Sequence, residues 1–350
     1  MAKIVDVARR AGVSVGSVSR VINEHPTVTP ATRERVELAV RELGYVPNAI
    51  AGSLRSRRSK TVGLIIPDVT NPFFSELALH VERSAAVAGY NVFLGNSDNS
   101  VDQQRHYLRA FAIRRVDGVI LVPANEMRAS FEFAVPIIGV DREVGGRPFV
   151  ASDNVGGAKS AIEYLCALGH RLIGCVAGPR ELPNAHARRK GYEKIAGSML
   201  QTAGVDPSNY VVPGDFSYDA GYAAGRLLLE MTPRPTAIFA SSDQQAIGAM
   251  RAAADLGLAV PRDLSIVGFD DIPLAKLVMP RLTTVGQPVR EIGVLAMQLL
   301  LDLLSGAAAP RPRRRLLATS LQIRESCAPP IASGSAAVRQ VKKALLYSNS

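Results

Sequence analysis

Two successive series of short apolar runs that alternate with helical segments fill the chain from residue 61 to residue 326. Strands this short, alternating with helices, are typical of parallel sheets covered by helices on both faces. Two series of the same design therefore predict an α/β body of two similar lobes with Rossmann-like topology. The expected strands are 62–66, 91–94, 118–122, 135–140, 172–176, 210–212, 237–240 and 265–267. The expected helices are 73–88, 102–114, 187–203, 219–230 and 244–256.

The first 46 residues instead predict an all-α head of three short helices, at 4–11, 14–23 and 31–43. Ala8 is the small residue that two crossing helices need at their contact, and Gly12 suits a left-handed turn after the first helix. Val18 and Val21 face inward, and Thr29 is the expected N-cap of the third helix. This spacing is typical of a helix-turn-helix, with a three-helix protein-interaction module as the alternative. The third helix is expected to face inward with Val36, Leu38, Ala39, Val40 and Leu43.

Positive charge is concentrated in the head. The whole chain has a net charge of +10, and residues 1–60 hold eleven Lys and Arg but five acids, a net +6. The last twenty residues contribute +3, so the middle of the chain is close to neutral. A basic head on a nearly neutral body indicates a polyanionic partner for the head, which favours DNA binding over the protein-interaction module.

In a helix-turn-helix the second helix enters the major groove, and its first turn meets the base edges. Arg20 can pair with a guanine, and Val15 can contact a thymine methyl group. Four arginines elsewhere in the head are interpreted as phosphate contacts or as a solvated face: Arg9, Arg10, Arg33 and Arg35. The expected outward residues are Ser14, Val15, Gly16, Ser17, Ser19 and Arg20.

The run that begins IVDVARRAGVSVGSVSRVIN and continues to NPFF resembles the start of LacI/GalR-type bacterial repressors, and the resemblance extends to about Ser326. It implies a homodimer on a pseudo-palindromic operator in double-stranded DNA. It also implies a hinge helix near 48–55 that wedges Leu54 into the minor groove, and Gly52 stands where this family commonly has Arg. The remaining expected DNA contacts are Asn23, Tyr45, Ala51 and Arg55.

The resemblance also implies how the chain is divided into domains. It implies a helix-turn-helix domain at 1–46, a hinge at 47–60 and a two-lobed, periplasmic-binding-protein-like domain at 61–326 that binds ligand and dimerises. The chain should cross between the lobes three times, with 288–316 returning to the first lobe. Residues 327–350 are expected to form a disordered tail.

A ligand site is expected between the lobes, because ligands of open α/β sheets bind beyond the carboxyl ends of the strands. Carboxylates, arginines and aromatic rings follow several predicted strands, and this mixture suits a polyhydroxylated ligand such as a sugar or a nucleoside. Arg188 and Asp270 are expected to face each other across the cleft. The alternative for Asp153, Asp215 and Asp243 is that they only cap helices or close turns. The resemblance carries ligand contact onto Phe73, Phe74, Asp141, Arg142, Asn184, Arg188, Phe216, Asp243 and Asp270.

The expected function is a repressor that responds to a small-molecule effector, without metal or cofactor, in the bacterial cytoplasm at the nucleoid. The alternatives are a solute-binding protein of a transporter and an α/β enzyme. Asp6 is an acid at a position where a signal peptide would have its apolar stretch, so export is not expected. No apolar run is long enough to span a membrane. The chain has no GxxxxGK[ST] or HExxH motif, and its five histidines have no metal-ligand spacing. The sequence leaves open whether the effector is an inducer or a co-repressor.

Overall fold

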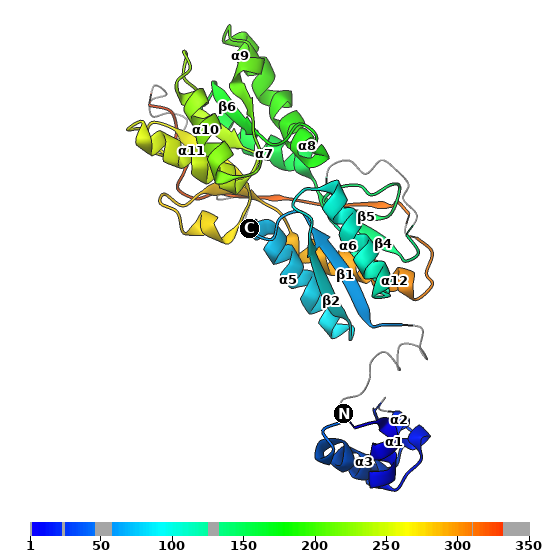
Figure 1. Cartoon of the computed structure of the whole chain (residues 1–350). Coiled ribbons are helices and arrows are strands. Elements are labelled where there is room, and N and C mark those ends of the chain that lie inside the picture. The colour runs from blue at the N-terminus through cyan, green and yellow to red at the C-terminus, as the bar shows by residue number, and fades with distance from the viewer. Residues whose placement is uncertain (1, 23–24, 46–57, 125–132, 310, 332–350) are drawn as a thin grey trace, which may run out of the picture. The chain divides into compact units, whose positions relative to one another are not determined.

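The computed structural model describes residues 2–22, 25–45, 58–124, 133–309 and 311–331 (Figure 1). The chain divides between Ser59 and Lys60 into two compact units. We call the first unit the head and the second the body, and each is described by itself. Among the described residues, no helix combines the length and the apolar character that crossing a bilayer requires.

The head is a three-helix unit formed by α1 (Ile4–Ala11), α2 (Val15–Ile22) and α3 (Pro30–Glu42). Its core contains Val7, Val18 and Val36, which are completely buried. Gly12 ends α1 in the left-handed conformation at φ 64°, and the Thr29 side chain accepts a hydrogen bond from the Thr32 amide at the start of α3. The predicted helix-turn-helix packing is confirmed.

The inward face predicted for α3 is partly wrong. Val36 and Ala39 are buried, but Leu38 is 48% exposed and Leu43 is 37% exposed. A helix advances about 100° per residue, so Leu38 lies about 200° from Val36 and points away from the core. Hydrophobicity alone misplaced these two leucines.

The body contains two six-stranded sheets, and each sheet is the centre of one lobe. Their strand orders are β11-β5-β4-β3-β1-β2 and β12-β10-β9-β8-β6-β7. Neighbouring strands are parallel except for the antiparallel pair β10 and β12. The first sheet consists of β1 (Thr61–Ile66), β2 (Asn91–Asn96), β3 (Gly118–Leu121), β4 (Ile137–Val140), β5 (Phe149–Ser152) and β11 (Arg314–Leu317). The second consists of β6 (Ile173–Ala177), β7 (Val211–Pro213), β8 (Ala237–Ala240), β9 (Ser265–Asp270), β10 (Thr283–Gly286) and β12 (Ser320–Gln322).

Helices cover both faces of each sheet, as predicted (Figure 1). The first lobe has α5 (Pro72–Val87), α6 (Val101–Ile113) and α12 (Val289–Leu304). The second lobe has α7 (Asn154–Ala167), α8 (Pro183–Tyr192), α9 (Ser198–Thr202), α10 (Tyr218–Leu229) and α11 (Asp243–Asp255). A π-helix, Glu193–Gly197, joins α8 to α9, and 3-10 helices lie at Pro207–Tyr210 and Pro273–Lys276.

The chain passes between the lobes three times, as the resemblance implied. The crossings run from β5 to α7, from β10 to α12 and from β11 to β12. Because β5 and β11 are neighbours in the first sheet and pair along their length, two of these crossings lie side by side. These two crossings therefore bring residues of both lobes next to each other.

Several predicted elements were wrong or missing. The helix expected at 187–203 begins at Pro183 and is interrupted by the π-helix. β5, α7, β10, α12, β11 and the short β12 were not predicted as helices or strands. The packed body continues past the expected boundary at 326. Cys327 and Ala328 form hydrogen bonds with residues of β9, and the Ala328 carbonyl lies within hydrogen-bond distance of His170 Nε2.

Candidate functional site

The head presents α2 as the candidate DNA-reading helix. Val15 and Arg20 are exposed on it. Ser14 Oγ accepts a hydrogen bond from the Ser17 amide at 3.1 Å and lies 3.0 Å from Ser17 Oγ, so these two hydroxyls also hold the start of the helix. Tyr45 packs against the head core. The expected contacts Asn23, Ala51, Leu54 and Arg55, and the hinge near 48–55, lie outside the described residues.

Of the four arginines interpreted above as phosphate contacts or as a solvated face, three have partners within the head. Arg10 pairs with Glu42 at 2.7 Å and so links α1 to α3. Arg35 donates to the Gly12 carbonyl at 3.1 Å, and Arg9 lies 3.7 Å from Asp6. Arg10 and Arg35 thus have a structural role beside any contact with phosphate.

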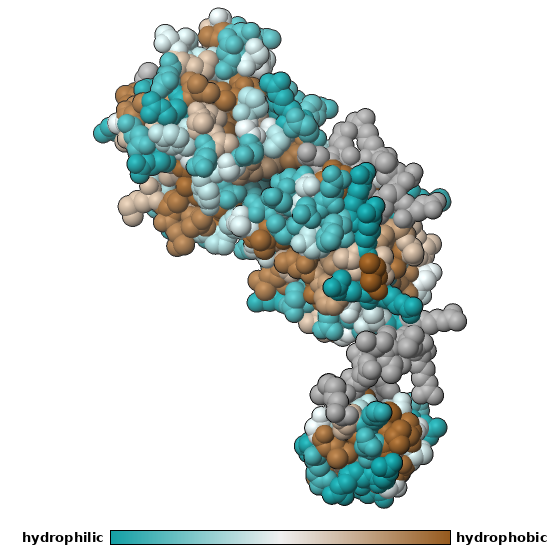
Figure 2. Space-filling model, viewed as in Figure 1, coloured by the Kyte–Doolittle hydropathy of each residue, from teal (hydrophilic) through white to brown (hydrophobic). Residues whose placement is uncertain are grey.

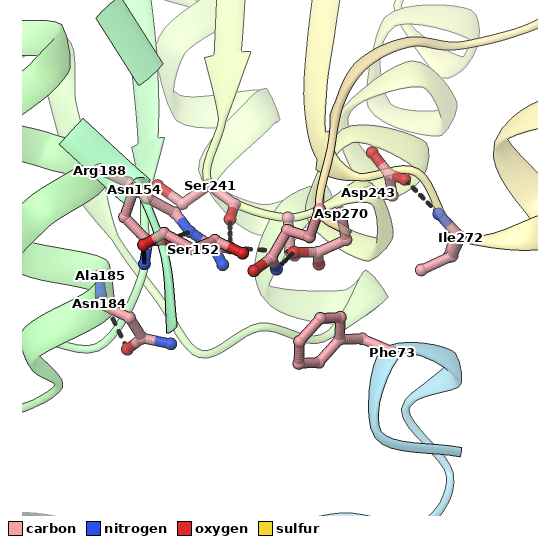
Figure 3. A network of polar contacts seen from close by, with 12 residues as sticks. Phe73, Ser152, Asn154, Asn184, Ala185, Arg188, Ser241, Asp243, Asp270 and Ile272 are labelled. Atoms are coloured by element: carbon pink, nitrogen blue, oxygen red, sulfur yellow. Dashed lines mark hydrogen bonds and ion pairs between the residues drawn. The ribbon is translucent and has the colours of Figure 1, made fainter. Parts of the chain in front are cut away.

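In the body, Arg188 on α8 is the centre of a buried polar network (Figure 3). Its Nε donates to Asn154 Oδ1 at 2.7 Å, and its Nη1 donates to the Ser241 carbonyl at 2.5 Å. Nη1 also lies 3.2 Å from Asp270 Oδ1. The network therefore joins α7, α8, β8 and β9, all within the second lobe. The expectation that Arg188 and Asp270 face each other across the cleft is wrong, because α8 and β9 belong to the same lobe.

Two aromatic rings of the second lobe lie beside this guanidinium. The Arg188 guanidinium carbon is 3.9 Å from the centre of the Phe269 ring and 5.6 Å from that of Phe216. Gly178 makes room for Phe216, since a Cβ on Gly178 would lie 2.5 Å from that ring. Cation–π contact and close packing thus fix the orientation of Arg188.

Asp270 is held in an unusual backbone conformation at the end of β9. Its φ is 122°, a value that residues other than glycine rarely adopt. Its Oδ1 accepts from Gln287 Nε2 at 2.7 Å as well as from Arg188. Burial raises the pKa of this carboxyl to about 6, while the positive charge of Arg188 opposes the shift.

A second ion pair and a cross-lobe hydrogen bond meet at Asp141. Asp141 Oδ2 accepts from Asn184 Nδ2 of α8 at 2.7 Å and lies 3.5 Å from Arg142 Nε. Arg142 Nη1 donates to the Pro123 carbonyl at 2.7 Å. Burial lowers the pKa of the Arg142 guanidinium, and the negative charge of Asp141 opposes that shift. Because Asp141 follows β4 of the first lobe, its bond to Asn184 connects the two lobes directly.

The first lobe contributes two aromatic rings from the start of α5. Phe73 and Phe74 are buried, with ring centres 5.1 Å apart and planes at 74°. Asn71 caps this helix by accepting from the Phe73 amide at 3.0 Å. Figure 3 shows the Phe73 ring directed toward Asp270. The network thus has aromatic faces on both sides.

Asp243 is placed differently from the sequence-based expectation. The N-cap of α11 is Ser242, whose side chain accepts from Gln245 N, so the interpretation of Asp243 as the N-cap is wrong. The Asp243 carboxylate is completely buried and accepts from the Ile272 amide at 2.9 Å and from the Thr284 hydroxyl. Burial, and then the charge of Asp270, raise the pKa of Asp243. By contrast, Asp153 caps α7 and Asp215 closes a turn, as the alternative interpretation expected.

Several buried polar atoms of this region have no hydrogen-bond partner among the described residues. They are Asp141 Oδ1, Arg142 Nε, Ser152 Oγ, Ser241 Oγ and Gln287 Oε1. Buried polar atoms are normally paired, so such a group at one location indicates a site that a polar ligand completes. A cavity of about 180 Å³ adjoins it, and its walls include Asp141, Arg142, Ser152, Asn154 and Asn184.

Sequence reasoning missed Ser152, Asn154, Ser241 and Gln287. Three of them follow the same strand-end rule that identified Asp141 and Asp270. Ser152 ends β5, Ser241 follows β8, and Gln287 follows β10. A prediction of β5 and β10 would have found the first and the last of these.

Comparison with known proteins matches both parts of the chain. Residues 3–48 match the model of bacterial regulatory proteins of the lacI family, and residues 162–327 match a periplasmic binding protein-like domain. The ribose operon repressor of Halalkalibacterium halodurans is 41% identical over 303 residues, which covers 86% of this chain and 90% of that protein.

Two solved structures are also similar. The lac repressor dimer bound to operator and an anti-inducer has a TM-score of 0.82 at 29% identity, with 93% of this chain and 99% of that chain covered. The complex of the transcriptional regulator CelR with cellobiose has a TM-score of 0.69 at 34% identity, with 93% and 100% covered.

A helix-turn-helix in the same chain as a two-lobed body with a buried polar site defines a ligand-responsive DNA-binding regulator. The chain belongs to the LacI family of bacterial regulatory proteins. It is a transcriptional repressor that responds to a ligand.

Proposed function

We propose that the protein represses transcription as a homodimer on a pseudo-palindromic operator, and that a sugar or sugar derivative bound between the lobes controls this repression. The observation that carries the proposal is the group of unpartnered buried atoms beside two ion pairs and aromatic rings. Hydroxyl groups of a sugar can donate to the carboxylates and accept from the guanidinium groups, while the rings cover its C–H faces. The resemblance of the chain to a ribose operon repressor and to a cellobiose-bound regulator supports the same ligand class.

Each predicted ligand residue has a role in this proposal. Asp141 and Asp270 accept hydrogen bonds from effector hydroxyl groups, Arg142 and Arg188 donate hydrogen bonds to them, and Asn184 holds Asp141 in place from the other lobe. Phe73, Phe74 and Phe216 supply aromatic faces. We propose that Asp243 instead holds the loop after β9, since both of its oxygens already accept hydrogen bonds.

A homodimer would cover apolar surface that both lobes expose (Figure 2). β2 is an edge strand of the first sheet, yet Phe93 and Leu94 on it are exposed. In the second lobe, Leu277 and Met279 are exposed, Met279 to 94%. Uncovered apolar edge strands promote aggregation, and contiguous apolar patches mark interfaces. The dimeric lac repressor structure supports a second copy of this chain as the partner.

Operator contact is proposed for α2, with Arg20 at the base edges, and for the hinge with Leu54 in the minor groove. The proposed location is the bacterial cytoplasm at the nucleoid, where operator DNA is found. We propose no catalytic role, and neither metal nor cofactor is required for binding.

Selection of binding sites from random double-stranded DNA by the full-length protein tests the proposal. The selected sequences should contain an inverted repeat, and fluorescence anisotropy on that repeat should change when the matching sugar is added. A panel of sugars is first screened by thermal shift, in which a ligand at 100 times its Kd stabilises the protein by about 2.7 kcal/mol. Selected sites without two-fold symmetry would contradict the dimer. Absence of any sugar that stabilises the protein would contradict the effector class.

A further inference from the structure

One apolar side chain of the second lobe is buried inside the core of the first lobe. Ile272 lies in the loop that follows β9, and it is 1% exposed. It belongs to the apolar core that contains Phe73, Phe74 and Leu77 of α5. Among the described residues, every other buried member of this core comes from the first lobe. Ile272 therefore joins the two lobes by apolar packing.

The main chain of Ile272, in contrast, is held by the second lobe. Its amide donates to Asp243 Oδ2 at 2.9 Å (Figure 3), and its carbonyl accepts from the Ala275 amide at 2.9 Å. Asp243 is a completely buried residue of α11, and Ala275 is buried in the core of the second lobe. The backbone of Ile272 therefore follows the second lobe, while its side chain is surrounded by the first.

The segment that connects Ile272 to the proposed effector site is short and has an unusual backbone. Asp270 of that site lies two residues before Ile272, and both Asp270 and Asp271 have a positive φ, at 122° and 60°. The Asp271 carboxylate is itself fixed by an ion pair with Arg324, which follows β12. Residues in such rarely populated conformations persist only where their surroundings hold them, and they are common in switch regions. A shift of Asp270 is therefore passed to Ile272 through a single residue that is held in place.

We infer that Ile272 is the positioning residue through which effector binding at Asp270 changes the first lobe. The inference rests on the proposed function and adds the route of its regulation. An effector hydroxyl group that binds Asp270 changes the contacts of that carboxylate, and the segment that follows transfers the change to Ile272. Because protein cores are closely packed, a shift of Ile272 moves α5 instead of being absorbed locally. The change then reaches the lobe that follows the head in the chain.

The test measures how strongly a sugar changes operator binding by the full-length protein. The operator Kd is measured by fluorescence anisotropy with and without sugar, on the inverted repeat selected from random DNA, and the ratio of the two values is the coupling ratio. D-Ribose and cellobiose are the first probes, since similar regulators are named for ribose and were solved with cellobiose. The wider sugar panel follows if neither binds. The native coupling ratio should be roughly 5–150-fold.

Ile272→Ala should lower the coupling ratio to less than about twofold. The Kd of the sugar without DNA, measured by calorimetry, should stay within about threefold of the native value, because the buried side chain of Ile272 offers no surface to the effector. A purely structural role would not separate these two quantities. A native coupling ratio in Ile272→Ala would show that the effector joins the lobes by its own contacts alone. That result overturns the inference and leaves sugar-controlled repression in place.

Ile292→Ala is the matched control. Ile292 is also 1% exposed in the same core, but it lies on α12 and has no connection to the loop after β9. The control removes the same volume, so we expect a similar loss of stability but at least about half of the native coupling ratio. Equal loss of coupling in both variants would show that any cavity in this core uncouples the protein, and would overturn the inference.

A milder pair keeps the test decisive if the alanine variants do not fold. Ile272→Val and Ile292→Val each remove one methyl group from the same core. We expect the first to lower the coupling ratio at least about threefold and the second less than about 1.5-fold. Equal coupling ratios in the two valine variants would contradict the inference. If no sugar changes the operator Kd of the native protein, the proposed function itself fails.

Discussion

Arg188 Nη1 lies 3.2 Å from Asp270 Oδ1, and both residues belong to the second lobe. This ion pair is therefore complete within one lobe and does not by itself draw the lobes together. The 2.7 Å hydrogen bond from Asn184 to Asp141, by contrast, links the two lobes directly. Asp141 therefore joins the two lobes as well as lining the proposed effector site, whereas Arg188 and Asp270 belong to the second lobe alone.

Asn184→Ala should weaken effector binding without changing which sugar is preferred. The change removes the cross-lobe donor but leaves both ion pairs intact. We expect effector affinity to fall by about 0.5–1.5 kcal/mol, with the preference among sugars unchanged. Calorimetry with a panel of sugars measures both quantities. A changed rank order of sugars would show that Asn184 selects the ligand instead of joining the lobes.

Effector binding should depend on pH through Asp270. Its pKa is raised from 3.8 to about 6 in the folded protein, and an effector hydroxyl donates best to the ionised carboxylate. Effector affinity should be constant above about pH 7 and should fall below about pH 6, by at most about tenfold per pH unit for one proton. Asp270→Asn should bind more weakly and should flatten this profile. A native profile that is flat from pH 5 to pH 8 would refute this role for Asp270.

The raised pKa of Asp270 affects stability in the opposite direction: the free energy of unfolding falls as the pH rises, whereas effector affinity increases. Because the folded pKa exceeds the unfolded value, the folded state holds this proton more tightly between about pH 4 and pH 6. The destabilising contribution of ionised Asp270 is therefore fully present above about pH 6 and disappears as the pH falls toward 4. Melting curves of native protein and Asp270→Asn over this range should converge at the acidic end.

Asp243 should prove to be a positioning residue. Asp243→Ala leaves the buried Ile272 amide without its acceptor, which should destabilise the body by about 1–3 kcal/mol. Asp243→Asn should be close to native in stability, because its carbonyl oxygen can accept from Ile272 and its amide can donate to Thr284. Denaturant unfolding of both variants measures the difference. Equal destabilisation by Asn and Ala would show that the negative charge, and not the hydrogen bond, is what the site needs.

Sequence pattern predicted most of the fold because alternation of apolar runs reports burial directly. It failed where tertiary packing decides. Gly156 and Gly157 weaken the helix propensity at the start of α7, yet a Cβ on Gly157 would lie 2.9 Å from Val285 and 3.1 Å from the Phe269 ring. The close approach of α7 to the second sheet requires glycine there, and a glycine-rich start conceals the helix from a propensity argument.

The candidate site was likewise predicted only where its residues follow recognisable apolar runs. The strand-end rule found Asp141 and Asp270, whose strands have clear apolar runs. It missed Ser152 and Gln287, because β5 (FVAS) and β10 (TTVG) contain polar and small residues and do not stand out as apolar runs. The contact of Arg188 with Asp270 joins residues 82 positions apart in the chain, and no local pattern encodes such a contact.

Base recognition by the head should depend on Arg20. Arg20→Ala should weaken operator binding by about 1–3 kcal/mol and leave binding to random DNA nearly unchanged. Arg10→Ala is a useful comparison, since Arg10 pairs with Glu42 and its loss should lower the stability of the head instead. Anisotropy on operator and on scrambled DNA of equal length measures the effect. Equal losses on both would make Arg20 a phosphate contact.

The central claim is that occupancy of the site in the body changes operator affinity of the head. Its most direct test is the operator Kd of the full-length protein with and without saturating effector, in native protein and in Asp270→Asn. Native protein should show a coupling of about 1–3 kcal/mol, or roughly 5–150-fold, and operator should change effector affinity by the same factor. Asp270→Asn should bind operator normally and respond only at much higher effector concentrations. An effector that binds native protein by calorimetry but leaves operator Kd unchanged would contradict the account.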